Sequence, residues 1–203
     1  MASADDVLDL VSARKGHFRL ESGHHGGLWL DLDTMFVEPR RVRPLIAALA
    51  GALHSHAITG VCGPLLGGAF LAQAVAAALE IDCFFTERLT PNTRDRLFAA
   101  EYRLPHALQA RVRDKRLAIV DDVMSAGSAA RGTYTELKAH GAEPVAIGAL
   151  LVLGSVGETF FAAEGLPVEA AARRPYDLWP PAQCPLCAAG MPLEDLAWPT
   201  PAS

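Results

Sequence analysis

Apolar, strand-like segments alternate twice with helix-patterned segments in the central part of the chain. In each unit a short apolar run is followed by a loop of small residues, after which apolar residues recur at helical spacing. The first unit comprises Ala57–Cys62 (strand), Gly63–Gly68 (loop), Ala69–Leu79 (helix) and Asp82–Thr86 (strand). The second comprises Leu117–Val120, Asp121–Gly127, Ser128–His140 and Val145–Leu153 in the same order. This alternation predicts an α/β fold, a doubly wound and mainly parallel sheet with helices on both faces.

The segments on either side are less regular. A short helix is expected from Ser3 to about Arg14, then strands at His17–Leu20 and Leu28–Leu32, and a helix from Pro39 to about Leu53. Seven of the 14 prolines fall between Pro175 and Pro201, which predicts an irregular tail. We therefore expect one domain over residues 1–172 and a proline-rich tail over 173–203.

Composition excludes several classes of protein. With 203 residues, 51% of them hydrophobic and 20% charged, the chain can bury one sizeable core. The net charge of −5 offers no basic surface for nucleic acid. The charge-free stretch Pro44–Leu79 is interrupted by His, Gly and Pro, so no membrane partner is expected. The acidic N-terminus does not read as a signal peptide, and a cytoplasmic location is expected.

The segment Leu117–Ala129 carries the most chemistry: an apolar strand, the carboxylates Asp121 and Asp122, and small residues that begin a helix. Backbone N–H groups of Ser125–Ala129, with two serine hydroxyls, can surround a phosphate at the positive end of that helix. The carboxylates can accept hydrogen bonds from a pair of sugar hydroxyls or hold a metal-bound water. The simpler interpretation is that the carboxylates cap the helix. A phosphorylated sugar fits both halves of the segment.

This string resembles the phosphoribosyl-pyrophosphate motif of type I phosphoribosyltransferases, in which four hydrophobic residues, two acidic residues and a Thr/Ser-x-Gly loop follow one another. Residues Gly16–Asp31 resemble the N-terminal segment of orotate phosphoribosyltransferases, with its Gly-x-Phe-x-Leu-x-Ser-Gly pattern. The resemblance covers about residues 5–155. It implies an N-terminal hood over about residues 1–36, magnesium (Mg²⁺) as cofactor, and a homodimer. The implied reaction displaces pyrophosphate from 5-phosphoribosyl 1-pyrophosphate with a ring nitrogen of orotate.

The resemblance also implies residue roles. Asp121 and Asp122 would bind the ribose hydroxyls and, through water, the magnesium carried by the substrate, without a direct protein–metal bond. The 5-phosphate would lie on Ser125–Ala129 and the pyrophosphate on Gly63–Gly68. The residues expected to contact phosphoribosyl pyrophosphate are Asp121, Asp122, Val123, Met124, Ser125, Ala126, Gly127, Ser128, Ala129, Leu66, Gly67, Gly68, Arg94 and Arg96.

The chain departs from the family in its basic residues. The orotate enzymes carry a lysine near the end of the pyrophosphate loop, where this chain has Gly67, and lysines and a histidine in a mobile loop. The corresponding loop here, expected within Glu87–Arg116, offers Arg88, Arg94 and Arg96 instead. Arginine can neutralise pyrophosphate but cannot donate a proton near neutral pH. We expect Arg88 to act with Asp121 and Asp122 in catalysis; the alternative is a solvated arginine surface.

The acceptor base is less constrained. The family's arginine that grips the orotate carboxylate is missing, because the matching strand ends Val152–Ser155. Ser125, His25 and Tyr102 are the candidate base-binding residues, and Trp179 could stack on a base. Orotate is the first acceptor to test. A purine or another base remains an alternative, as does a sensor that binds the donor without catalysis.

The four cysteines do not indicate a disulfide framework. Cys62 and Cys83 lie in predicted strands and are expected to be core thiols. Cys184-Pro-Leu-Cys187 is half of a zinc-binding spacing, and zinc usually requires four ligands. We expect no stoichiometric zinc; the alternative is a structural zinc that two chains of a dimer share.

Overall fold

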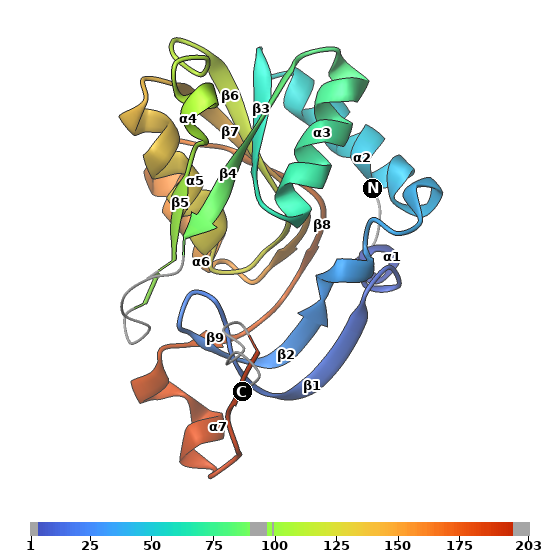
Figure 1. Cartoon of the computed structure of the whole chain (residues 1–203). Coiled ribbons are helices and arrows are strands. Elements are labelled where there is room, and N and C mark those ends of the chain that lie inside the picture. The colour runs from blue at the N-terminus through green and yellow to red at the C-terminus, as the bar shows by residue number, and fades with distance from the viewer. Residues whose placement is uncertain (1–3, 90–96, 99, 197–203) are drawn as a thin grey trace, which may run out of the picture.

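The structure is a computed structural model, and it describes residues 4–89, 97–98 and 100–196. Its centre is a six-stranded sheet in the order β5-β4-β3-β6-β7-β8 (Figure 1). β3, β4, β6, β7 and β8 pair in parallel, and only β5 at one edge is antiparallel within this sheet. The strands are β3 (Gly60–Pro64), β4 (Asp82–Leu89), β5 (Glu101–Arg103), β6 (Arg116–Met124), β7 (Glu143–Leu153) and β8 (Val168–Arg174).

Helices cover both faces of this sheet, because alternate residues of the buried strands are apolar in both directions. Val61, Ala118 and Val120 pack against α2 (Pro39–His54) and α3 (Gly67–Leu79). Leu117 and Ile119 face the other side, toward α5 (Ser128–Ala139) and α6 (Val156–Ala163). The short helices α1 (Ala4–Leu8) and α4 (His106–Gln109) lie at the margins. The two cores fix the carboxyl ends of the strands in a rigid frame.

A second, smaller sheet lies beyond the carboxyl ends of the central strands (Figure 1). Its hairpin is formed by β1 (Ser12–Arg19) and β2 (His25–Asp31), followed by the 3₁₀ turn η1 (Leu32–Thr34). The tail completes it: β9 (Leu178–Trp179) pairs with β2, and β10 (Glu194–Asp195) pairs with β1. Between them lie η2 (Pro181–Gln183) and α7 (Pro185–Ala188). The hood is therefore built from both ends of the described chain.

The predicted α/β class, the doubly wound parallel sheet and both central units are confirmed. Several boundaries were wrong. The first helix ends at Leu8 rather than near Arg14, because Ser12–Arg14 pair with β2 as strand. The stretch Glu87–Arg116, expected to be one long loop, contains the end of β4 together with β5 and α4. β8 was missed, and it runs to Arg174, so the boundary predicted at residue 172 falls inside a strand. The tail carries short strands and is not wholly irregular.

Among the described residues, no helix is both long and apolar enough to cross a membrane. The charge-free stretch that begins at Pro44 is divided between α2, β3 and α3, each with its own place in the larger core.

Candidate active site

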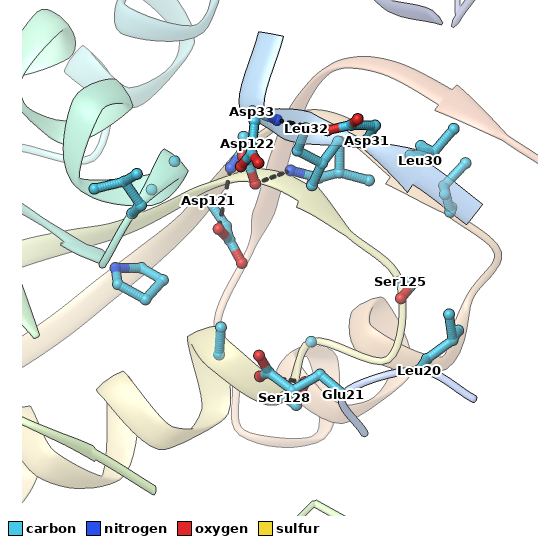
Figure 2. Close-up of a pocket in the computed structure, with 18 of the residues that line it drawn as sticks. Leu20, Glu21, Leu30, Asp31, Leu32, Asp33, Asp121, Asp122, Ser125 and Ser128 are labelled. Carbon is cyan, nitrogen blue, oxygen red and sulfur yellow. Dashed lines mark hydrogen bonds between the residues drawn. The ribbon is translucent and has the colours of Figure 1, made fainter. Parts of the chain in front are cut away.

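A pocket of about 460 Å³ opens at the carboxyl ends of β3 and β6 (Figure 2). β3 is followed by α3 and then by β4 on one side, whereas β6 is followed by α5 and then by β7 on the other. The direction of winding thus reverses between β3 and β6. Open α/β sheets bind ligands in the crevice that such a reversal creates. The volume falls within the range of small-molecule sites.

Asp121 and Asp122 lie at the floor of the pocket, and both are buried. The backbone N–H of Asp122 donates to Asp121 Oδ1 over 3.1 Å, and that of Val123 donates to Asp122 Oδ1 over 2.7 Å. Burial raises the pKa of Asp121 well above its ordinary value, and the charges of Asp122 and Glu21 add to the effect. Burial also raises the pKa of Asp122, although the Val123 N–H opposes this. The free pocket therefore holds carboxylates that gain from a cation or hydroxyl donors.

The loop between β3 and α3 forms one wall. Close approach requires glycine on both sides of this loop, at Gly63 in β3 and at Gly67, the first residue of α3. A Cβ atom at Gly67 would lie 1.8 Å from Asp122 Oδ2, and one at Gly63 would lie 1.9 Å from the Gly68 carbonyl oxygen. The Leu65–Leu66 peptide is cis. The loop backbone consequently lies directly against the Asp122 carboxylate.

The amino end of α5 forms the opposite wall. Gly127 precedes the helix with φ +73°, a left-handed conformation that favours glycine, and its carbonyl accepts the first helical bond from Arg131 N. The N–H groups of the first turn of a helix have no intrahelical acceptor. With the Ser125 and Ser128 side chains beside them, these groups can donate hydrogen bonds to an anion at this wall.

Glu21, from the hairpin turn of the hood, connects three parts of the site. Its Oε1 accepts hydrogen bonds from Tyr102 Oη over 2.9 Å and from Ser128 Oγ over 3.2 Å. Its Oε2 lies 3.3 Å from Arg88 Nε. Burial and the nearby Glu21 charge raise the pKa of Tyr102 above its ordinary value, so Tyr102 stays a hydrogen-bond donor. Figure 2 shows Glu21 next to Ser128, across the pocket from Asp121.

The hood supplies the remaining wall. Asp31 and Asp33 line the pocket on the side of Asp122, and Trp29 and Tyr176 add aromatic surface. The described lining contains five carboxylates, those of Glu21, Asp31, Asp33, Asp121 and Asp122, and one guanidinium, that of Arg88. An anionic ligand would therefore enter this pocket more favourably with a cation than alone.

Most of the residues predicted to form the site come together. Those that line the pocket are Asp121, Asp122, Val123, Ser125, Gly127, Ser128, Ala129, Leu66, Gly67, Gly68, Arg88 and Tyr102. Met124, the last residue of β6, and Ala126, in the loop that follows, are each 1% exposed and absent from the described lining. Arg94 and Arg96 lie outside the described residues.

The expectation for His25 has to be corrected. Its side chain is buried in the hood, where Nδ1 lies 3.1 Å from His17 Nε2, and it does not line the described pocket. Its place in β2 rather than in a turn explains the difference, because β2 begins at His25. Trp179 likewise pairs with His25 in the hood sheet and contributes nothing to the described lining, whereas Trp29 does.

Sequence reasoning assigned no role to Glu21, Asp31 or Asp33. Glu21 and Asp31 lie inside the segment that resembles the orotate enzymes. The sequence of a hairpin does not indicate which part of the central sheet its carboxylates will face. Their position over the carboxyl ends of β3 and β6 depends on how the hood folds back onto the sheet.

Comparison with solved structures identifies the class of fold. Orotate phosphoribosyltransferase from Aeropyrum pernix superposes with a TM-score of 0.61 at 18% identity, covering 82% of this chain and 89% of that chain. Adenine phosphoribosyltransferase from Rhodothermus marinus gives a TM-score of 0.63 at 20% identity, covering 84% and 97%. The fold is that of the type I phosphoribosyltransferases.

The sequence comparisons narrow the class to one family. Orotate phosphoribosyltransferase from Carboxydothermus hydrogenoformans is 32% identical over 188 residues, covering 92% of this chain and 91% of the relative. The enzyme of the same name from Thermotoga maritima is 29% identical over 190 residues, covering 93% and 94%. No family model matches the chain. The chain belongs to the orotate phosphoribosyltransferase family of pentosyltransferases, which confirms the predicted resemblance.

Proposed function

We propose that the protein transfers the 5-phosphoribosyl group of 5-phosphoribosyl 1-pyrophosphate to orotate, with release of pyrophosphate. The observation that carries the proposal is the placement of the Asp121–Asp122 pair between an anion-binding helix end and a backbone-lined loop. Ribose hydroxyls, a 5-phosphate and a pyrophosphate need three such surfaces around one sugar. The relationship to curated orotate enzymes supports orotate as the acceptor.

In this proposal Asp121 and Asp122 accept hydrogen bonds from the ribose hydroxyls and orient the ring. The first turn of α5, with Ser125 and Ser128, holds the 5-phosphate. In the free protein the Ser128 hydroxyl donates its hydrogen bond to Glu21. In this proposal the hydroxyl donates to the 5-phosphate instead when the donor binds. The loop at Leu66–Gly68 presents backbone to the pyrophosphate.

Magnesium fits this donor set, because it prefers oxygen ligands and is commonly bound by one or two carboxylates together with substrate phosphates. Asp121 or Asp122 would hold it through water. When bound, the ion neutralises charge on the departing pyrophosphate. It also offsets the repulsion between phosphates and the five carboxylates of the pocket.

Arg88 has the position to assist departure of the pyrophosphate, since it comes from β4, next to the β3–α3 loop, and lines the pocket. It is paired with Glu21 in the free protein, so it is held in place before the donor arrives. No other guanidinium lines the described pocket, which leaves the orotate carboxylate without a dedicated arginine there. We therefore expect turnover to require a high orotate concentration, that is, a high KM for orotate.

The test is formation of pyrophosphate and the corresponding nucleotide from donor, magnesium and a panel of bases that includes orotate, uracil and adenine. Orotate should be the productive base. Asp122→Asn should reduce turnover by about 100-fold, or about 2.7 kcal/mol of transition-state stabilisation. Asp82→Asn, at the opposite end of β4 and paired with Lys115, is the matched control and should retain activity.

Two other outcomes have defined meanings. Turnover with adenine in place of orotate would identify a purine enzyme, an outcome of interest because adenine phosphoribosyltransferases share this fold. Magnesium-dependent donor binding without turnover on any base would indicate a sensor. In both cases the assignment of orotate as acceptor would be rejected.

A homodimer is part of the proposal. Val37, Leu66 and Phe70 expose 72%, 61% and 51% of their surface, and Phe70 contacts Phe36 at a ring-centroid distance of 5.8 Å. Leu65 extends the same apolar surface at the pocket rim. Contiguous exposed apolar patches mark interaction sites in soluble proteins. A second copy of the chain covering this patch would bring two pockets close to one interface.

A further inference from the structure

Four metal-ligating side chains converge in the hood, away from the pocket. His17 comes from β1 and His25 from β2, whereas Cys184 directly precedes α7 in the tail and Cys187 lies within it. Their ligand atoms all lie within 4.8 Å of one another. Three of these residues are buried, and Cys187 is exposed. The sequence displayed only the two cysteines as a pair, because the histidines lie about 160 residues earlier in the chain.

Four of the six separations between the ligand atoms are close to those of a tetrahedral site. Zinc–nitrogen bonds of about 2.0–2.1 Å and zinc–sulfur bonds of about 2.3 Å place neighbouring ligand atoms roughly 3.3–3.8 Å apart. His17 Nε2 lies 3.1 Å from His25 Nδ1, 3.4 Å from Cys184 Sγ and 3.7 Å from Cys187 Sγ. Cys187 Sγ lies 3.3 Å from His25 Nδ1. Small adjustments of the side chains would place all four atoms within bonding distance of one ion.

The hydrogen bond made by the second ring nitrogen of His17, Nδ1, favours metal binding through Nε2. Its Nδ1 lies 2.9 Å from the Met191 carbonyl oxygen, which can only accept, so Nδ1 carries the proton. Nε2 therefore directs its lone pair at the centre of the cluster. A histidine that binds a metal commonly donates its second ring N–H to a carbonyl in this way. Without a metal, this lone pair faces two thiols and a second imidazole, which cannot all donate to it.

The tail has little else to hold it on the hood. Within the described residues 177–196, Cys184 is the one buried residue, and α7 contributes no buried apolar side chain besides. The two tail strands pair over two residues each. A segment with so small a core usually needs a cross-link to keep one conformation.

We propose that His17 Nε2, His25 Nδ1, Cys184 Sγ and Cys187 Sγ bind one structural Zn²⁺ ion. Both thiols lose their protons to solvent on binding, and the four protein ligands close the coordination sphere, leaving no position for substrate. The ion joins the tail to both strands of the hairpin. The turn between its two histidine ligands carries Leu20 and Glu21, so the ion fixes the part of the hood that faces the pocket. This replaces the expectation of no stoichiometric zinc.

The experiment is elemental analysis of the full chain, purified under reducing conditions, incubated with Zn²⁺ and desalted. About one zinc per chain is expected, as for a closed structural site. The double variant Cys184→Ser/Cys187→Ser should lose it. Cys83→Ser is the matched control, because Cys83 is a free thiol in β4 of the central sheet, and this variant should keep its zinc.

Cobalt substitution of the unaltered chain keeps the proposal testable if the double variant does not fold. Co²⁺ in this site should show tetrahedral d–d absorption and thiolate-to-metal charge transfer, both abolished by added zinc. A chain that stays metal-free after incubation overturns the proposal, as does zinc retained in the folded double variant.

Discussion

Two adjacent carboxylates are buried at the floor of the pocket at the expense of stability. Burial raises the pKa of Asp121 and of Asp122, so the native state binds protons more tightly than the unfolded chain does. Stability contributed by these groups is therefore present at low pH and is lost as the pH rises from the ordinary aspartate range through the raised values. At neutral pH the free protein bears the cost of burying these carboxylates. We expect binding of the donor and a cation to reduce that cost.

Asp121→Asn is expected to stabilise the fold at neutral pH by about 1 kcal/mol, within the usual range for single substitutions. The amide removes the buried charge and keeps an oxygen that can accept the Asp122 N–H bond. The gain should shrink as the pH falls toward the ordinary aspartate pKa, where the wild-type carboxyl is protonated. Denaturant unfolding at several pH values measures it. A variant less stable than wild type at pH 7 would contradict the assigned cost.

Arg88→Ala should lower turnover by about 100-fold while changing donor affinity by less than about 10-fold, because only the transition state carries the full leaving-group charge. Arg88→Lys should recover part of the turnover, since it restores charge without the guanidinium fork. Arg103→Ala is the control: Arg103 lies on neighbouring β5, exposed and 3.9 Å from Glu101. Steady-state kinetics and donor-binding calorimetry separate the two effects. A loss of donor affinity with kcat unchanged would assign Arg88 to ground-state binding.

The element that shapes the site is the β3–α3 loop, whose backbone passes against Asp122. Its path requires glycine at position 67, where a side chain would collide with the carboxylate. The side chain of a lysine at this position would meet the same carboxylate. In the present arrangement the space is already filled by Asp122.

Gly67→Ala should displace Asp122 and reduce turnover by at least about 10-fold, or about 1.4 kcal/mol. The matched control is Gly51→Ala in α2, where a new methyl group meets nothing within 4 Å. That variant should be fully active and more stable by about 0.5–1 kcal/mol, the usual gain of alanine over glycine in a helix. Activity assays and thermal unfolding of both variants provide the comparison. Full activity of Gly67→Ala would show that Asp122 does not depend on the loop.

The elements that could be predicted from sequence are those with a local signal. Helical spacing and the buried strands of the two central units were sufficient to locate α3, α5, β6 and β7 within a few residues. β8 escaped because Val168–Arg174 mixes alanines with charged residues, and its pairing with β7 is a property of the sheet. The Asp121–Ala129 part of the site was predictable because it is contiguous. Glu21 and the His17–His25 pair were not, since their partners lie far away in the chain.

At the scale of the whole molecule, the exposed apolar residues around α3 are the feature that the isolated chain leaves uncovered. Phe70→Asp should weaken self-association, because it places a charge in the patch formed with Phe36, Val37, Leu65 and Leu66. Sedimentation equilibrium should give twice the 21.6 kDa chain mass for wild type and a concentration-dependent shift to 21.6 kDa for the variant. Leu193→Asp, an equally apolar exposed site in the tail, should leave the mass unchanged. A monomeric wild type would reject the dimer.

The hood sheet joins strands from both ends of the described chain, and this has a consequence for biosynthesis. On the ribosome the hairpin β1–β2 emerges first, but its neighbours β9 and β10 emerge only after the whole central sheet. Until residue 179 has left the exit tunnel the hairpin lacks both of its edge partners, and until residue 195 has left it the hairpin still lacks β10. A nascent chain can therefore complete its hydrophobic cores well before its pocket has a finished roof.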